Sequence, residues 1–307
     1  MSAAINHPDW IAVDWGTSHL RLWKMARSGA VLGRLDSDQG MGKLAPEAFE
    51  PVLLDLLKGD LPAEGHLSVV CCGMVGSRQG WAEAGYLAVP TAPPGIAQAT
   101  YVHCHGGRLS VHILPGLSQQ SPADVMRGEE TQIAGYLHDQ PDFDGVLCLP
   151  GTHCKWAHVS AGEVVSFRTF MTGELFALLS GQSVLRHSVA AKGFDGAAFG
   201  NAVAQAISSP HALAGDLFAL RAEALVAGLD PIVARSRLSG LLIGAELAAA
   251  RPYWLGRDIV IIGESDLARA YHAALSAQGV APRLVNAEEM TLNGLRAAYA
   301  QLREHNL

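Results

Sequence analysis

The stretch Ile11-Ala-Val-Asp-Trp-Gly-Thr-Ser-His-Leu-Arg-Leu-Trp23 decides the fold that we expect for this chain. An apolar run, Trp10 to Val13, ends in Asp14, and the turn residues at 16–18 precede a second strand-like run over 20–25. This pattern predicts a β-hairpin that opens the fold. A strand that ends in Asp and turns through Gly-Thr-Ser presents backbone N–H groups and hydroxyls to an anion, and its carboxylate can hold a hydrated Mg²⁺. Ordinary hairpin turns use the same residue types, so this stretch alone leaves both interpretations open.

The second half of the chain begins with the same pattern. The apolar run 145–149 is followed by the turn Pro150-Gly151-Thr152-His153 and by a strand-like run that begins at Lys155. Two such turns, one from each half, predict that both hairpins face the phosphate tail of one nucleotide. Lys155 would then bind a phosphate, and the alternative is a solvated lysine beside a turn.

A third glycine turn, Gly263-Glu264-Ser265, follows the apolar pattern at 259–262 and precedes an amphipathic run over 267–277. A glycine at this place lets a planar base approach the backbone, and the N-terminus of a helix adds hydrogen-bond donors. The turn therefore predicts an adenosine site, with a helix-capping turn as the alternative. We interpret the glycines in the segment 240–244 as a close contact between helices.

An acidic group lies between the two hairpins. The sequence predicts a helix over 123–137 that carries Asp124, Glu129 and Glu130 in its first half, with Arg127 among them. Phosphoryl transfer needs a carboxylate that accepts the proton of the attacking hydroxyl, and a general base contributes about 10²- to 10⁴-fold. Acids at a helix start are also favoured by the helix dipole, so the phosphate turns are what favour a catalytic interpretation.

The remaining pattern alternates strands and helices. Thr172 is predicted to cap a helix over 174–179. Other predicted strands lie at 31–35, 67–72, 111–114, 155–159, 164–170 and 283–285, and other predicted helices at 46–57, 197–207, 213–227, 231–250 and 287–302.

Length and composition limit the classes of function. The 307 residues, of which 49% are hydrophobic, are enough for two domains, and the net charge of −7 without a run of like charges disfavours nucleic acid as a partner. The five cysteines lack a CxxC pair and predict reduced thiols. The chain has no targeting pattern at its N-terminus and no apolar stretch long enough for a membrane, so we expect a cytoplasmic protein. A P-loop, a GxGxxG after a strand, an HExxH and a GxSxG are absent.

These residues together resemble the actin-like ATPase and sugar-kinase superfamily, and within it the 2-dehydro-3-deoxygalactonokinase family. The segments that carry the resemblance are 11–23, 72–81 (CGMVGSRQGW), 113–117 (ILPGL), 124–135 (DVMRGEETQIAG), 149–156 (LPGTHCKW), 167–179 (FRTFMTGELFALL), 238–246 (LSGLLIGAE) and the turn at Gly263. The resemblance implies an α/β, two-domain actin-like fold, ribonuclease H-like and duplicated, with an inter-domain cleft. It also implies transfer of the ATP γ-phosphoryl group, with Mg²⁺, to O6 of a 2-dehydro-3-deoxy sugar acid.

The resemblance further implies roles for individual residues. By analogy Glu129 is the proton acceptor, with Asp124 second, although related kinases place an Asp there, and Asp14 holds Mg²⁺ through water. The loop from Gly73 to Trp81 resembles the sugar-contacting loop, in which Arg78 suits the substrate carboxylate because guanidinium binds carboxylates through two parallel hydrogen bonds. The implied ATP phosphate ligands are Gly16, Thr17, Ser18, Gly151, Thr152 and Lys155, the adenosine ligands are Gly263, Glu264 and Ser265, and the substrate ligands are Arg21, Gly73, Met74, Arg78, Arg127 and Arg168.

The expected lobes are 1–140, with the first phosphate motif and the sugar-contacting loop, and 141–285, with the second phosphate motif and the adenosine motif. Residues 286–307 are expected to form a helix that packs back on the first lobe. A kinase for another sugar or sugar acid, and a nucleotide-hydrolysing or regulatory protein of the same fold, are the alternatives. The sequence leaves the oligomeric state open, a homo-oligomer included.

Overall fold

A computed structural model describes residues 7–263 and 265–305 of the chain. For residue 305 it describes the backbone alone. The chain divides into two compact units. Unit 1 comprises Met1–Phe143, Ala161–Val165 and Ala287–Leu307, and unit 2 comprises Asp144–Ser160 and Ser166–Asn286. The functional roles that the sequence assigned to the lobes 1–140, 141–285 and 286–307 stay predictions.

The main sheet of unit 1 has six strands in the order β3-β2-β1-β4-β7-β6. The strands are β1 (Trp10–Trp15), β2 (Leu20–Met25), β3 (Val31–Ser37), β4 (Leu67–Gly73), β6 (Thr100–Val102) and β7 (Leu109–Ile113). Antiparallel pairing of β1 with β2 confirms the predicted hairpin, and β4 and β7 extend the sheet in parallel. Parallel strands end at the same edge of a sheet, so β1 and β4 bring Asp14 and Gly73 to one edge.

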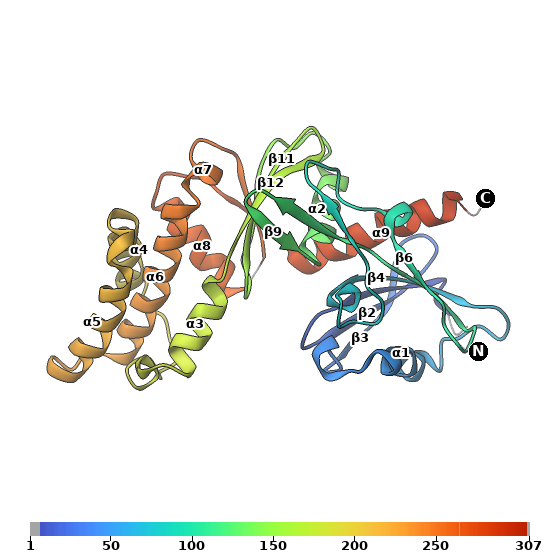
Figure 1. The fold of residues 1–307 in the computed structure, drawn as a ribbon, viewed down its shortest axis with the longest axis horizontal. Coiled ribbons are helices and arrows are strands. Elements are labelled where there is room, and N and C mark those ends of the chain that lie inside the picture. The colour runs from blue at the N-terminus through green and yellow to red at the C-terminus, as the bar shows by residue number, and fades with distance from the viewer. Residues whose placement is uncertain (1–6, 264, 306–307) are drawn as a thin grey trace, which may run out of the picture. The chain divides into compact units, whose positions relative to one another are not determined.

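Helices cover the two faces of this sheet because successive side chains of its strands point to opposite sides. Helix α1 (Phe49–Leu57) packs on the face that carries Ile11, Val13 and Trp15, whereas α9 (Ala287–His305) packs on the face of Trp10 and Ala12. Helix α2 (Glu129–Asp139) lies beside α9 (Figure 1). A Cβ at Gly135 of α2 would overlap the carbonyl oxygen of Met290, so these two backbones are in contact.

The segment before α2 differs from the prediction. The helix expected over 123–137 is wrong in its first part, because Ala123–Met126 is strand β9, which pairs with β8 (Gly116–Gln120) in a three-stranded sheet with β5 (Tyr86–Ala88). Gly128, at a φ of 104°, then redirects the chain, and α2 begins at Glu129. Asp124 therefore lies on a strand and outside the helix that Glu129 and Glu130 begin.

Unit 2 repeats the strand order of unit 1. Its strands are β10 (Gly145–Leu149), β11 (Cys154–Ser160), β13 (Ile259–Ile262), β14 (Arg283–Val285) and, from Ser166 onward, β12 (Glu163–Phe170). The strand order of the sheet is β12-β11-β10-β13-β14. Strands β10 and β11 form an antiparallel hairpin, and β13 and β14 extend the sheet in parallel. The order β3-β2-β1-β4-β7 in unit 1 has the same arrangement. This duplication confirms the predicted α/β, actin-like fold.

The helices of unit 2 gather around α6 (Pro231–Ala249) (Figure 1). The others are α3 (Thr172–Gly181), α4 (Gly196–Ser208), α5 (Leu213–Val226), α7 (Arg251–Trp254) and α8 (Asp266–Ser276), and α6 packs against α3, α4 and α5. The close helix contact predicted at 240–244 is confirmed, because a Cβ at Gly244 would lie 2.6 Å from the Val203 carbonyl oxygen. Short 3-10 helices occupy Met41–Lys43, Pro46–Ala48, Met74–Gly76, Ile96–Gln98, Val184–His187 and Pro210–Ala212.

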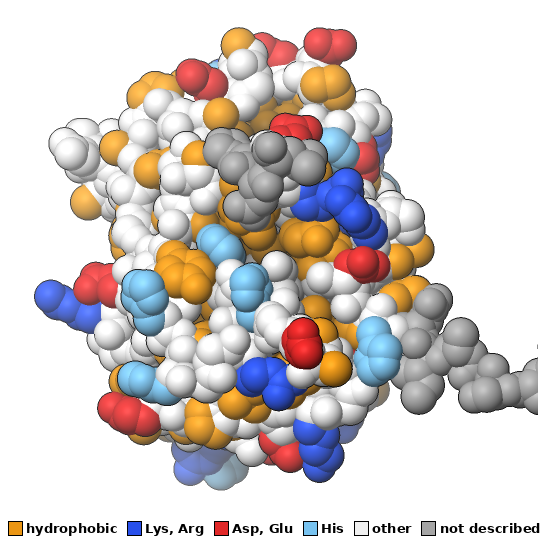
Figure 2. Space-filling model, turned by 90° about the vertical axis from the view of Figure 1, so that its right-hand side faces the viewer, with side chains coloured by type: hydrophobic (Ala, Val, Ile, Leu, Met, Phe, Trp, Pro, Cys, Tyr) orange, Lys and Arg blue, Asp and Glu red, His pale blue; other side chains and the backbone are white. Residues whose placement is uncertain are grey.

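On the face drawn in Figure 2, Lys and Arg side chains are interspersed with acids and histidines and form no continuous basic stripe. None of the helices in the described part of the chain is both long and apolar enough to span a bilayer. All five cysteines fall within the described residues, and they are free thiols.

Candidate active site

Backbone hydrogen bonds fix the conformation of the first predicted phosphate turn, at 16–18. The Gly16 N–H donates to the His19 carbonyl oxygen at 2.9 Å, and the Met41 and Gly42 N–H groups donate to the carbonyls of Gly16 and Thr17, each at 2.9 Å. The side chains of Thr17 and Ser18 are exposed. The turn therefore presents two hydroxyls to solvent on a fixed backbone.

Asp14 lies at the end of β1, directly before this turn. The Arg21 guanidinium donates to the Asp14 carboxylate. Burial raises the pKa of Asp14, and the charge of Arg21 opposes that rise. A Cβ at Gly73 would lie 3.2 Å from Asp14 Oδ1, so the glycine leaves room at this carboxylate. Asp14 offers a hard oxygen ligand of the kind Mg²⁺ prefers, and because Arg21 already occupies one side of it, contact with the ion through water fits the site.

The two acids that begin α2 differ in accessibility. Glu130 is fully buried, and its two carboxylate oxygens accept the Gly128 N–H at 2.8 and 2.7 Å. Burial, reinforced by the neighbouring Glu129, raises the pKa of Glu130 to about 8. Glu129 is half-buried, and its Oε2 accepts the Arg127 N–H at 3.1 Å. A Cβ at Gly128 would lie 3.5 Å from the Cα of Gly73, so the start of α2 adjoins the end of β4.

The four candidate arginines have different surroundings. Arg127, the residue after β9, donates to the Ala84 carbonyl oxygen at 2.6 Å and lies 4.3 Å above the ring of Tyr86, so it contacts both the segment before β5 and β5 itself. Arg21 is engaged by Asp14. Arg78, in the loop after β4, and Arg168, on β12 of unit 2, are both exposed. Met74, beside Gly73, is half-buried.

The second predicted phosphate turn, Gly151-Thr152, is backed by the first turn of α3. A Cβ at Gly173 would overlap the Gly151 carbonyl oxygen, and the Glu174 N–H donates to the Thr152 carbonyl oxygen at 2.9 Å. His153 Nε2 and Glu174 Oε2 are 2.6 Å apart. The turn and the start of α3 therefore form one packed group.

The structure contradicts one interpretation of Lys155 and the prediction for Thr172. The solvated alternative for Lys155 is wrong, because the residue is only 5% exposed and its Nζ donates to Thr169 Oγ1 at 2.8 Å. Its phosphate role stays a prediction. The predicted cap at Thr172 is also wrong, because Thr172 is the first residue of α3 and its hydroxyl donates to the buried carboxylate of Glu246.

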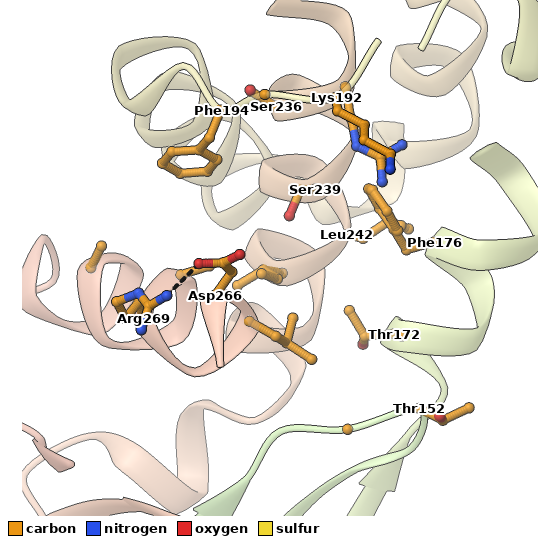
Figure 3. A pocket seen from close by; sticks show the side chains of 18 residues that line it. Thr152, Thr172, Phe176, Lys192, Phe194, Ser236, Ser239, Leu242, Asp266 and Arg269 are labelled. Atoms are coloured by element: carbon orange, nitrogen blue, oxygen red, sulfur yellow. Dashed lines mark hydrogen bonds and ion pairs between the residues drawn. The ribbon is translucent and has the colours of Figure 1, made fainter. Parts of the chain in front are cut away.

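A cavity of about 960 Å³ opens beside this turn, wholly within unit 2. Its walls are the turn at Gly151-Thr152, the start of α3, one side of α6, the first two turns of α8 and the loop 192–194. In Figure 3, Thr152 and Thr172 lie at one end and Lys192 and Phe194 at the other, with Ser239 and Asp266 between them. A volume near the upper end of the range for small-molecule sites suits a ligand the size of a nucleotide.

Several polar and aromatic residues of this cavity escaped the sequence analysis. They are Phe176, Lys192, Phe194, Arg235, Ser236, Ser239, Asp266 and Arg269. The available signal was the pair of serines at 236 and 239, which lie three residues apart and are hence neighbours on the helix surface.

The third predicted turn, at 263–265, lies at the edge of this cavity. The Gly263 N–H donates to the Val285 carbonyl oxygen at 2.8 Å, and Ser265 Oγ accepts the Ala268 N–H at 3.3 Å, so Ser265 caps α8. Among the described residues, the part of the lining that α8 contributes begins at Asp266, the next residue along the chain. Glu264 lies outside the described residues, and an adenosine role for this turn stays a prediction.

Comparison with known proteins identifies the family to which the chain belongs. The sequence profile of the 2-keto-3-deoxy-galactonokinase family matches residues 14–298. A protein of Rhizobium meliloti (strain 1021) named "Probable 2-dehydro-3-deoxygalactonokinase" is 40% identical over 94% of this chain and 96% of its own length. The 2-dehydro-3-deoxygalactonokinase of Escherichia coli (strain K12) is 33% identical over 94% of this chain and 96% of its own length.

Solved structures agree with this result. A crystal structure of a Sinorhizobium meliloti protein assigned as a 2-dehydro-3-deoxygalactonokinase matches with a TM-score of 0.89 and 39% identity, over 95% of this chain and 99% of that one. Component A of (R)-2-hydroxyglutaryl-CoA dehydratase from Acidaminococcus fermentans matches with a TM-score of 0.52 and 14% identity, over 95% of this chain and 98% of that one, and shares the fold alone. The chain therefore belongs to the 2-keto-3-deoxy-galactonokinase family and is an ATP-dependent carbohydrate kinase.

Proposed function

We propose that this kinase phosphorylates 2-dehydro-3-deoxy-D-galactonate at O6 with Mg²⁺ and ATP, releasing the 6-phosphate and ADP, as a cytoplasmic step of galactonate breakdown. In this reaction O6 bonds to the γ-phosphorus, the bond from that phosphorus to the β–γ bridging oxygen breaks, and the O6 proton passes to a carboxylate. The observation that carries the proposal is the cavity of unit 2 that begins at the Gly151-Thr152 turn. The names of the two curated relatives support the choice of substrate.

In this proposal unit 2 holds the nucleotide. The backbone N–H groups of Gly151 and Thr152 and the Thr152 hydroxyl would bind phosphate oxygens, in the manner of turns that cradle anions. The adenosine would lie between α6 and α8, where the cavity has both apolar walls and hydroxyls. Gly263 and Ser265, at the start of α8, would border it. Lys155 is the weaker candidate for a phosphate contact because its amine already donates to Thr169.

Unit 1 would supply the proton acceptor, and Glu129 is the better candidate. A base must reach the substrate hydroxyl within hydrogen-bond distance. Glu129 is half-buried at the start of α2, whereas Glu130 is fully buried with both oxygens directed to the Gly128 N–H. Glu130 therefore suits the role of an internal helix cap. Asp124, which lies on β9, stays the second candidate.

Asp14 is the proposed metal ligand of unit 1, assisted by the exposed hydroxyls of Thr17 and Ser18 and the backbone of Gly16. Bound Mg²⁺ neutralises charge on the phosphate oxygens during transfer. Arg21 would keep the Asp14 carboxylate oriented, since its guanidinium donates to that carboxylate. This contact favours a positioning role for Arg21 over direct contact with the substrate.

Arg78 is the proposed partner of the substrate carboxylate. It is exposed in the loop after β4, the loop that begins beyond Gly73 and Met74 in the sequence, whereas Arg127 already binds the Ala84 carbonyl oxygen and the Tyr86 ring. A guanidinium with free donors can bind a carboxylate through two parallel hydrogen bonds. Arg168 of unit 2 is the alternative, because it too is exposed.

A coupled ADP-release assay with 2-dehydro-3-deoxygalactonate and its C4 epimer tests this function. We expect sugar-dependent ADP release with the galactonate-derived acid, and phosphorus coupling at C6 of the product in the carbon NMR spectrum. Turnover of neither epimer would refute the substrate. ADP release at the same rate without sugar would instead identify a nucleotide-hydrolysing protein.

A further inference from the structure

A buried carboxylate, Glu246, lies in unit 2 on helix α6 and has no role in the proposed reaction. It is 3% exposed and accepts hydrogen bonds from Trp156 Nε1 at 2.7 Å, from Tyr271 Oη at 2.5 Å and from the Thr172 hydroxyl. These donors belong to β11, α8 and α3 respectively. One side chain therefore joins four elements of the unit.

These four elements are the surroundings of the nucleotide cavity. Helices α3, α6 and α8 form walls of the cavity, and β11 begins directly after the turn that ends at His153. Thr172 lines the cavity, whereas Glu246 is not among its lining residues. Of the three residues that donate to Glu246, Thr172 therefore connects it to the cavity.

The contact through Thr172 leads to the phosphate turn. Thr172 is the first residue of α3, and the next two residues touch the turn. Gly173 packs against the Gly151 carbonyl, and the Glu174 N–H donates to the Thr152 carbonyl oxygen at 2.9 Å. A shift of the first turn of α3 would therefore move the backbone that is proposed to hold the phosphates.

We propose that Glu246 is a positioning residue for ATP, which fixes the start of α3 through Thr172 and thereby the phosphate turn at Gly151-Thr152. This inference rests on the proposed function, in which the cavity of unit 2 takes the nucleotide. Glu246 is the last residue of the segment 238–246 on α6. The helix forms a wall of the cavity, but Glu246 itself does not line it.

The chemistry of the site favours positioning over simple packing. Burying a carboxylate without a cation is unfavourable unless directed donors compensate, and an apolar residue of similar volume would pack at least as well. Within the described residues, no lysine or arginine forms an ion pair with Glu246, and its partners are neutral donors. Such donors bind in fixed directions, so they set the positions of the elements that carry them.

The test compares the affinities of ATP and adenosine in the full-length protein, measured by displacement of a fluorescent ADP analogue. Thr172→Val removes the donor and keeps the side-chain shape, and Glu246→Gln alters the acceptor without touching the cavity. Each should weaken ATP binding about tenfold or more, because the hydrogen bond between Thr172 and residue 246 is lost or weakened and the phosphate turn is released. Adenosine, which lacks phosphates, should bind to Thr172→Val within about twofold of its affinity for wild type, and Thr172→Ser should keep the ATP affinity of wild type.

Tyr271→Phe is the matched control, because it removes a donor to the same carboxylate from α8 and leaves α3 in place. It should keep the ratio of ATP to adenosine affinity. Wild-type ATP affinity in Thr172→Val, or an equal loss of ATP and adenosine affinity, would overturn the inference. If Glu246→Gln does not fold, Thr172→Val and its serine rescue decide the matter. A wild-type protein that binds neither ligand would refute the proposed function instead.

Discussion

The carboxyl group of Glu130 should make the stability of unit 1 depend on pH. The side chain is fully buried at the start of α2. Burial is the main cause that raises its pKa from 4.5 to about 8, and the adjacent Glu129 adds to it, whereas the Gly128 N–H opposes it. The folded protein therefore holds Glu130 largely protonated near neutral pH, while the unfolded chain ionises it.

The sign follows from proton linkage. A group whose pKa is higher in the folded state contributes its full stability below its unfolded pKa, and that contribution is lost as the pH rises through the folded pKa. One pKa unit corresponds to about 1.4 kcal/mol. With a rise from 4.5 to about 8, the free energy of unfolding should fall by about 3 kcal/mol between about pH 5 and about pH 7.5 because of this one group.

Urea unfolding of wild type and Glu130→Gln at about pH 5 and about pH 7.5 measures this contribution. The glutamine cannot ionise, so its free energy of unfolding should lack this loss. The difference in free energy of unfolding, variant minus wild type, should therefore be about 3 kcal/mol larger at about pH 7.5 than at about pH 5. Glu47→Gln, at an exposed site of a 3-10 helix, is the control and should show no such difference. A stability difference between Glu130→Gln and wild type that is the same at both pH values would refute the reasoning.

Three further outcomes are expected from the structure. Glu129→Gln should lower kcat by about 10²- to 10⁴-fold in a protein that still folds, and near-normal turnover would exclude Glu129 as the base. Arg78→Gln should raise KM for the sugar acid about tenfold and leave KM for ATP unchanged, whereas an unchanged KM for the acid would favour another arginine. Gly135→Ala should destabilise the protein by about 1–3 kcal/mol in thermal unfolding because its Cβ would overlap the Met290 carbonyl oxygen. Gly59→Ala, whose added Cβ would meet no atom within 4 Å, is its control and should stay within about 0.5 kcal/mol of wild type.

The duplicated hairpins could be predicted because their signals are local. In both halves an apolar run, a Gly-Thr turn and a second run lie within about fifteen residues, so the pairing partners are adjacent in the chain. The segment 123–126 was misread for the opposite reason. Its residues fit a helix by spacing, but they pair with β8 in a sheet, and only Gly128 marks the place where the helix can begin.

Of the cavity in unit 2, the sequence predicted a functional role for the Gly151-Thr152 turn at one end. The Gly151-Thr152 turn has a sequence pattern of its own, and the structure places it on the cavity wall. Other lining residues, Lys192, Ser239 and Asp266, follow one another at separations of 47 and 27 residues along the chain, and they come from the loop 192–194, α6 and α8. Polar residues so spaced resemble ordinary surface positions of separate helices, so composition and periodicity gave no reason to group them.

Glu246 differs from those cavity residues because the sequence did contain a signal for it. In a helix, positions three and four apart share a face, so Glu246 lies on the same stripe as Leu242 and Ile243, both of which are buried. A glutamate in the middle of an apolar stripe has too short a side chain to carry its carboxylate to water, so it must meet donors inside the protein. The donors themselves, from Trp156 and Tyr271, lie far away in sequence. The pattern therefore indicates that a buried acceptor exists, while its partners emerge only from the fold.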